Sequence, residues 1–141
     1  MIWYNPQTSL RDLEQLGKDS MADFLGIEWV KIGDDFIEAS MPVDARTRQP
    51  YGYLHGGASC VLAETLGSVA SALVVNPLEN KVLGLEINAN HLRPVQEGKV
   101  TGTARPLHLG RQTHVWDIRI CNADNKLVCI SRLTVAIVPN R

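Results

Sequence analysis

The spacing of hydrophobic positions predicts two short helices near the start of the chain. In residues 8–17, leucines recur every three residues, which is the spacing of one face of an amphipathic helix. Ser9 is a candidate N-cap for this helix, and Gly17 is a candidate stop signal. The segment 20–25 ends before Gly26, so we expect a second short helix there.

Alternation of hydrophobic and polar residues predicts six strands, separated by turn signals rich in Gly, Asn and Asp. The strands are expected at residues 27–32, 36–41, 81–91, 99–107, 112–121 and 126–138. Pro42 should end the second strand, because proline cannot donate to a sheet ladder. In the third strand, the alternation places Leu85, Ile87 and Ala89 together on the apolar face.

Residues 57–75, between the second and third strands, have a different pattern. Small and apolar residues fill almost every position, so we expect a long helix buried on most sides, ending at Asn76-Pro77. Two strands, one buried helix and four strands indicate an α+β fold, in which a curved antiparallel sheet wraps one helix. This is the hotdog arrangement, and we expect it to form a single domain over residues 1–141.

Composition and charge narrow the class of protein. Hydrophobic residues make up 45% and charged residues 21% of the 141 positions, which is typical of a globular domain with its own core. The net charge is −1 without a basic stripe, so neither nucleic acid nor an anionic membrane surface is expected as the main partner. The first residues lack signal-peptide features, and we expect no apolar run to reach the ~20 residues that span a bilayer.

The cysteines and histidines give no sign of a metal site or a disulfide framework. Cys60, Cys121 and Cys129 form no CxxC pair, and no two histidines have the spacing of a zinc site. An odd number of such cysteines suits a reducing compartment. We therefore expect no metal and a cytoplasmic location.

Glu64 is the only charged residue within the long apolar helix. A carboxylate in such a place is costly unless it is paired or functional. Burial would raise its pKa, which suits a general base working near neutral pH. The alternative explanation is an ion pair with an arginine or lysine from a neighbouring strand or subunit.

The start of the helix offers a second chemical group. His55, Gly56 and Gly57 precede or begin it, so we expect free backbone N–H groups there that can hold a developing oxyanion. An ordinary turn into a helix explains the same tripeptide. Glu64 lies about two turns beyond Gly57, and Ser68 lies about one turn further, so these side chains should share one helix face.

Two runs of residues around this helix carry a specific resemblance. They are His55-Gly56-Gly57-Ala58-Ser59 and Ala63-Glu64-Thr65-Leu66-Gly67-Ser68. They resemble the signature of the hotdog thioesterases whose catalytic carboxylate lies on the central helix, and the similarity extends over nearly the whole chain. Within that family, the chain is most similar to the group that hydrolyses 1,4-dihydroxy-2-naphthoyl-CoA in menaquinone synthesis. The proofreading thioesterases of enterobactin synthesis are a close second group.

The resemblance implies a role for each matching residue. Glu64 would be the nucleophile or general base, and the Gly57 N–H would polarise the thioester carbonyl. His55 would lie near the leaving sulfur, Gln49 would orient the carbonyl or the attacking water, and Ser68 would assist. Coenzyme A contacts would fall on Gly84, His91, Leu92, Arg93, Pro94, His108, Leu109, Gly110, Arg111, Gln112 and Thr113. No separate cofactor is implied, because coenzyme A is part of the substrate.

The resemblance also implies partners. The substrate would be an acyl-CoA, with an acyl carrier protein thioester as a further option. Subunits would pair and build each site from two chains, and a homotetramer formed as a dimer of dimers is expected.

Several alternatives stay open at this point. His55 and Glu64 also fit a hotdog dehydratase acting on a hydroxyacyl carrier protein, and the same fold serves as a non-catalytic acyl-CoA-binding module. The acyl group could be a medium or long fatty chain instead of an aromatic ring. His91 could be a core histidine, and the three tryptophans could form an aryl-binding surface, although a role in the core or in subunit contacts is the more common one.

Overall fold

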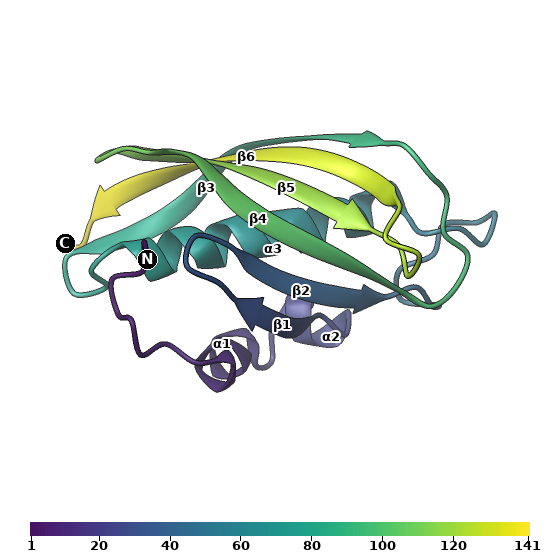
Figure 1. Ribbon diagram of the computed structural model, residues 1–141, viewed down its shortest axis with the longest axis horizontal. Coiled ribbons are helices and arrows are strands. Elements are labelled where there is room, and N and C mark those ends of the chain that lie inside the picture. The colour runs from purple at the N-terminus through teal and green to yellow at the C-terminus, as the bar shows by residue number, and fades with distance from the viewer.

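Six antiparallel strands form one sheet in the order β1-β2-β4-β5-β6-β3, and a long helix lies against its concave face (Figure 1). The computed structural model describes residues 1–141. The elements are α1 (Leu10–Gly17), α2 (Met21–Phe24), β1 (Glu28–Ile32), β2 (Ile37–Pro42), α3 (Gly56–Val74), β3 (Asn80–His91), β4 (Lys99–Leu109), β5 (Thr113–Cys121) and β6 (Leu127–Pro139). The predicted α+β hotdog fold is confirmed, and every predicted boundary lies within two residues of the observed one.

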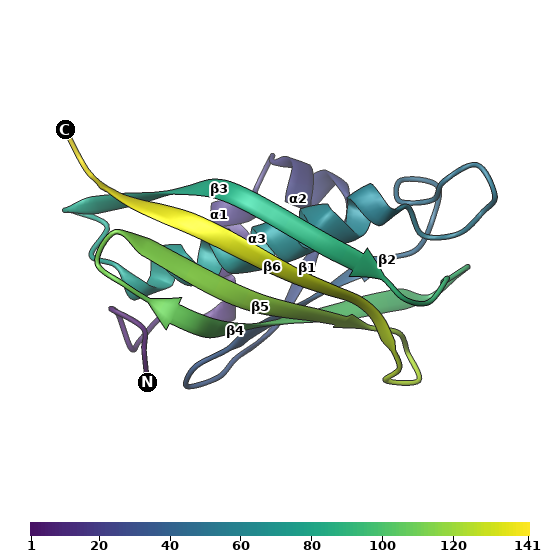
Figure 2. The same cartoon turned by 90° about the horizontal axis from the view of Figure 1, so that it is seen from above.

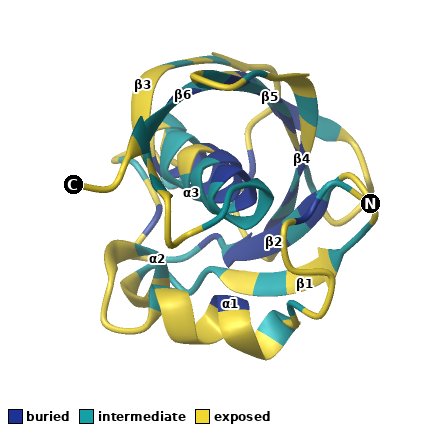
Figure 3. Cartoon of the chain, turned by 90° about the vertical axis from the view of Figure 1, so that its left-hand side faces the viewer, coloured by how far each residue is buried: buried dark blue, intermediate teal, exposed yellow.

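Close packing holds α3 against the sheet, which arches around the helix from β3 to β2 (Figure 3) and crosses over it in the view from above (Figure 2). Leu62 and Leu66 are fully buried on this side of the helix. A Cβ atom on Gly67 would lie 2.5 Å from Leu133 Cδ2. A Cβ atom on Gly102 of β4 would lie 2.6 Å from Leu66 Cδ1. The two glycines therefore allow the helix and the sheet to approach closely.

A bulge in β3 changes which of its side chains face the helix. The pairing of β3 with β6 shifts between Gly84 and Glu86, so Leu85 lies outside the regular alternation. Ile87 packs against the core, whereas Leu85 is 62% exposed. The expectation that Leu85 shares the apolar face with Ile87 is therefore wrong, and Gly84 faces the helix instead.

The helix α1 lies beside β1 (Figure 1), and its local interactions follow the sequence prediction. The Ser9 hydroxyl accepts a hydrogen bond from the Asp12 N–H at 3.3 Å, and the Asp12 carboxylate accepts one from the Ser9 N–H at 2.8 Å. This reciprocal pair is a capping box. Leu13 is fully buried, so one face of α1 joins the packed part of the molecule.

The helix α3 is long and apolar enough, by length and composition alone, to cross a membrane. The expectation that no apolar run reaches this length is therefore wrong. Its buried side chains pack against the sheet of the same chain, and this burial accounts for their apolar character.

The three tryptophans belong to the core and its margin, so the core alternative is confirmed. Trp3 and Trp116 are buried, and Trp29 packs against the core while half-buried. Trp3 Nε1 also donates a hydrogen bond to the Gly33 carbonyl at 2.6 Å, which fastens the N-terminal segment to the β1–β2 turn.

A buried polar cluster joins α3 to β5. The Ser71 hydroxyl accepts a hydrogen bond from Trp116 Nε1 at 2.7 Å and lies 3.1 Å from Nδ1 of His114. Because Ser71 accepts from the indole, its own proton is available to His114 Nδ1, and the proton of the neutral imidazole then lies on Nε2. Ser71 is fully buried and His114 is 2% exposed, so this serine–histidine pair is part of the core and not a site for substrate.

This cluster predicts a dependence of stability on pH. Burial, followed by the nearby His108, lowers the pKa of His114 below its ordinary value of 6.5. The unfolded chain therefore takes up this proton more readily than the folded one as the pH falls below about 6.5. The contribution of neutral His114 to stability is complete above that pH and is lost progressively below it.

We expect the free energy of unfolding of His114→Gln to fall less than that of wild type between about pH 7.5 and about pH 5.5, measured by urea titration. At the higher pH the variant should already be less stable by about 1–3 kcal/mol, because a buried hydrogen bond is lost. His91→Gln, at an exposed histidine, is the control and should follow wild type. Equal losses in all three proteins would contradict a neutral buried His114.

Candidate active site

Glu64 lies on the side of α3 that the sheet leaves open, opposite the buried Leu62 and Leu66 and bordered by the edge strand β3. Its carboxylate lies against β3, where a Cβ atom on Gly84 would be 2.6 Å from Glu64 Oε1. The side chain is exposed and takes part in none of the ion pairs of the chain. The expected burial is therefore wrong for the single chain, because the sheet covers only one side of the helix. Pairing with a cation of the same chain does not explain Glu64 either.

A shallow hollow of about 300 Å³ extends from this carboxylate to α2. It is lined by Met21, Val61, Glu64, Thr65 and Ser68. Ser68 follows Glu64 by about one turn, and the prediction that both side chains share one face of the helix is confirmed. The carboxylate thus adjoins the apolar side chains of Met21 and Val61.

His55 caps the N-terminus of α3 and changes the role expected for Gly57. The Gly57 N–H donates a hydrogen bond to His55 Nδ1 at 2.8 Å. The expectation of a free N–H at Gly57 is therefore wrong in this conformation, because the imidazole accepts the bond that a capping Ser or Asp usually accepts. With Nδ1 as the acceptor, the proton of the neutral imidazole lies on Nε2, and the side chain is exposed.

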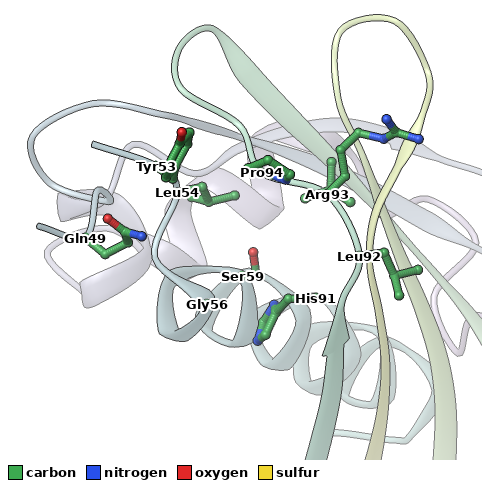
Figure 4. A pocket seen from close by; sticks show the side chains of 10 residues that line it. Gln49, Tyr53, Leu54, Gly56, Ser59, His91, Leu92, Arg93 and Pro94 are labelled. Atoms are coloured by element: carbon green, nitrogen blue, oxygen red, sulfur yellow. The ribbon is translucent and has the colours of Figure 1, made fainter. Parts of the chain in front are cut away.

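A cavity of about 360 Å³ lies next to the start of α3 and gathers many of the predicted residues (Figure 4). It is lined by Gln49, Tyr53, Leu54, Gly56, Ser59, His91, Leu92, Arg93, Pro94 and Val128. Gln49 lies in the loop before α3, where its Oε1 accepts a hydrogen bond from the Tyr51 N–H. The run His91 to Pro94 enters from the end of β3. The loop and the strand end are far apart in sequence, and the fold brings them together here.

His91 belongs to this cavity and not to the core. The residue is exposed, and its ring lies against the start of α3, where a Cβ atom on Gly56 would be 2.7 Å from His91 Nε2. The core-histidine alternative is therefore wrong for His91, and it is His114 that occupies that role. Arg93 adds an exposed guanidinium at the same wall, which is suited to bind a phosphate group.

Sequence reasoning missed four residues that line the cavity: Tyr53, Leu54, Ser59 and Val128. Tyr53 and Leu54 directly precede His55, and Ser59 follows Gly56 by three residues, so chain proximity to predicted positions could have identified them. Val128 lies on β6, and it reaches the cavity because β6 runs beside the end of β3. There the Val128 carbonyl accepts a hydrogen bond from the Leu92 N–H. No local pattern indicates such a pairing.

The remaining predicted contacts, His108 to Thr113, span the end of β4, the turn after it and the first residue of β5. The Gly110 N–H donates to the Thr113 carbonyl at 2.9 Å and closes this turn. His114 pairs with Val135, which pairs with Gly84, so the turn lies beyond the Gly84 end of the sheet. His91 is seven residues further along β3, roughly 23 Å at the rise of an antiparallel strand. One chain therefore does not bring the two predicted groups of coenzyme A contacts together.

The arrangement provides the groups of acyl-transfer chemistry without a metal cluster. Glu64 offers an accessible carboxylate, His55 offers an imidazole, and Gln49 offers a side-chain amide. No group of three or more His, Cys, Asp or Glu side chains is placed to hold a metal ion. A carboxylate of this kind can attack a carbonyl carbon or remove a proton from water.

Comparison with known proteins gives a consistent picture. The sequence model of the thioesterase superfamily matches residues 51–129. The chain is 54% identical over 138 residues to 1,4-dihydroxy-2-naphthoyl-CoA hydrolase of Escherichia coli, covering 98% of this chain and 100% of that protein. It is 47% identical over 138 residues to the proofreading thioesterase EntH of Cronobacter turicensis, covering 98% and 99%.

Among solved structures, the fold matches that of a mutant thioesterase, PA1618 (Q49A), from Pseudomonas aeruginosa. The TM-score is 0.97 and the sequence identity 51%, over 99% of this chain and 100% of that one. The substitution in that crystal structure replaces a glutamine with number 49, and residue 49 of this chain is also glutamine.

Proposed function

The chain belongs to the thioesterase superfamily and is a hotdog-fold thioester hydrolase, and we propose that its substrate is an aromatic acyl-CoA of the 1,4-dihydroxy-2-naphthoyl type. The proposal rests on one structural observation above all. Glu64 presents its carboxylate on the open side of the central helix, beside apolar side chains that suit an acyl group. The 54% identity to a hydrolase of that thioester supports the choice of acyl group. We further propose that the protein acts in the cytoplasm and that it catalyses a step of menaquinone synthesis.

Glu64 is the group that we propose to drive the reaction. In one route, its carboxylate oxygen attacks the thioester carbon and the C–S bond breaks, leaving a mixed anhydride and coenzyme A thiolate. Water then cleaves the anhydride, which releases the acid and restores the carboxylate. In the other route, Glu64 removes a proton from water, and the resulting hydroxide attacks the same carbon. Both routes consume one water and yield one acid and one thiol.

The entrance to α3 supports the developing charge in this proposal. The thioester oxygen gains negative charge as the carbon is attacked, and backbone N–H groups at a helix N-terminus favour such charge. For Gly57 to contribute its N–H, the His55 ring must turn away from its cap. That movement would place the imidazole beside the leaving sulfur. Gln49 lies across the entrance, where its amide can orient the carbonyl or the water.

We propose that each site combines two chains. In one chain, Glu64 and Ser68 line the hollow beside α2, whereas Gln49 and His91 line the cavity at the helix entrance. β3 is one of the two edge strands of the sheet and leaves one row of backbone groups unpaired. Antiparallel pairing of two β3 strands would place the His91 end of one chain beside the Gly84 end of the other. A dimer of such dimers gives the proposed tetramer.

A carrier-protein thioester is the second candidate substrate, supported by the similarity to proofreading thioesterases. Coenzyme A and carrier proteins present the same kind of thioester, so the Glu64 site serves either. The distinction lies in the surface around the entrance, where Arg93 is exposed.

The direct test of Glu64 is hydrolysis by wild type and Glu64→Gln of 1,4-dihydroxy-2-naphthoyl-CoA, benzoyl-CoA, lauroyl-CoA and a benzoyl carrier protein. We expect the variant to lose ~10³-fold or more in kcat with little change in KM, because Glu64 acts mainly in the transition state. Release of free thiol is the readout. Glu79→Gln, at an exposed glutamate outside both the hollow and the cavity, is the matched control and should keep wild-type rates.

Two results of this assay would contradict the proposal. Binding of the thioesters without any hydrolysis by wild type would favour a binding module. Full activity of Glu64→Gln would remove Glu64 from the mechanism. A preference for the carrier-protein thioester over every acyl-CoA would select the second candidate substrate.

Mixing two damaged chains tests whether the site is shared. Gln49→Ala and Glu64→Gln chains, each of low activity alone, are unfolded together in equal amounts and refolded. If each site takes Gln49 from one chain and Glu64 from the other, one site in every mixed dimer is intact, and about a quarter of wild-type activity should return. If both residues of a site come from one chain, no intact site forms, and the mixture stays at the level of the separate variants.

A further inference from the structure

We propose that Met21 of α2 forms the wall of the site that contacts the acyl group and thereby sets the acyl preference of the enzyme. This inference rests on the proposed attack by Glu64. The hollow at Glu64 has Met21 as its only residue from outside α3, and the other residues are Val61, Thr65 and Ser68 of the helix itself. The helix residues provide one side of the hollow, and Met21 provides the side across from them.

The position of the carbonyl carbon fixes where the acyl group must lie. For attack, that carbon must come within about 3–3.5 Å of a Glu64 oxygen. Its sulfur substituent leads toward coenzyme A, and its acyl substituent must occupy the surface on the other side of Glu64. In this chain that surface is the hollow, where Met21 and Val61 are the apolar contacts.

Hydrogen bonds to the loop before α3 and within its own segment hold the end of α2. Arg46 Nη1 donates to the Phe24 carbonyl at 3.1 Å, and the same guanidinium pairs with Asp44 at 2.7 Å. The Ile27 N–H donates to the Ala22 carbonyl at 3.0 Å. These bonds restrain the short helix that carries Met21. Its long unbranched thioether can still adapt to acyl groups of different shape.

Met21 also lies outside the part of the chain that matches the superfamily model, residues 51–129. Glu64, Val61, Thr65 and Ser68 lie inside it. The catalytic carboxylate and the helix side of the hollow thus come from the shared part of the family. Met21, on the other side of the hollow, comes from an N-terminal segment outside the match to the superfamily sequence model. This placement suits a residue that distinguishes substrates.

The test compares Met21→Ala, Met21→Trp and wild type on acetyl-CoA, benzoyl-CoA and lauroyl-CoA. Leu16→Ala is the matched control, because Leu16 is 65% exposed and Met21 64% exposed, and Leu16 does not line the hollow. Met21→Ala should change the ratio of kcat/KM for lauroyl-CoA to that for benzoyl-CoA about 10-fold. Met21→Trp should shift the preference toward acetyl-CoA, because its single methyl group is too small to need space or contact at residue 21. Leu16→Ala should leave all ratios unchanged.

Binding to an inactive background separates this inference from the proposed function. The dissociation constants of benzoyl-CoA and lauroyl-CoA are measured by calorimetry on Glu64→Gln, with and without Met21→Ala. An altered ratio of the two dissociation constants supports the contact of Met21 with the acyl group, even if wild type hydrolyses neither thioester. An unchanged ratio, in binding and in turnover, overturns it. Equal loss for all thioesters, together with a smaller oligomer on size exclusion, would make Met21 a subunit contact and would also overturn it.

Discussion

The close packing of one face of α3 against the sheet is the constraint on which the rest of the molecule depends. Leu62 and Leu66 are fully buried there, and Gly67 and Gly102 remove the Cβ atoms that would keep the helix and sheet apart. Because one side of α3 is fixed against the sheet, the opposite side of the helix is left uncovered. The register of the packed face therefore decides that Glu64, about half a turn away from it, points to the open side.

The same constraint separates the groups that we propose for catalysis within one chain. With α3 fixed, Glu64 lies beside Gly84 in the middle part of β3, and Gln49 lies beyond the helix entrance near His91. The exposed carboxylate of the single chain is surrounded by water, whereas charge stabilisation in acyl transfer gains strength when water is excluded. In the proposed dimer, assembly along the β3 edge would supply both the missing groups and the exclusion of water, so catalysis would depend on association.

Local signals in the sequence predicted the elements well and predicted side-chain environments less well. Ser9 and Gly17 identified α1 because capping depends on a few neighbouring residues. Leu85 was misplaced because a bulge depends on the pairing of β3 with β6, a contact between distant segments that no alternation encodes. The burial of Glu64 was overestimated because an apolar helix sequence does not distinguish burial by the same chain from burial by a second one.

Prediction from local sequence is limited in the same way within the candidate site, both for single hydrogen bonds and for the residues that line the hollow. The tripeptide from His55 to Gly57 correctly marked the helix start, but whether the Gly57 N–H is free depends on the rotamer of His55, which sequence does not give. Met21 carried no signal at all, since a methionine in a short helix has no periodicity to distinguish it. Its place beside the hollow depends on tertiary contacts of α2, among them the hydrogen bond from Arg46, over twenty residues later, to the Phe24 carbonyl. The groups that we propose for catalysis thus carry a local sequence signal, whereas the proposed acyl-binding surface combines distant segments and is visible only in the structure.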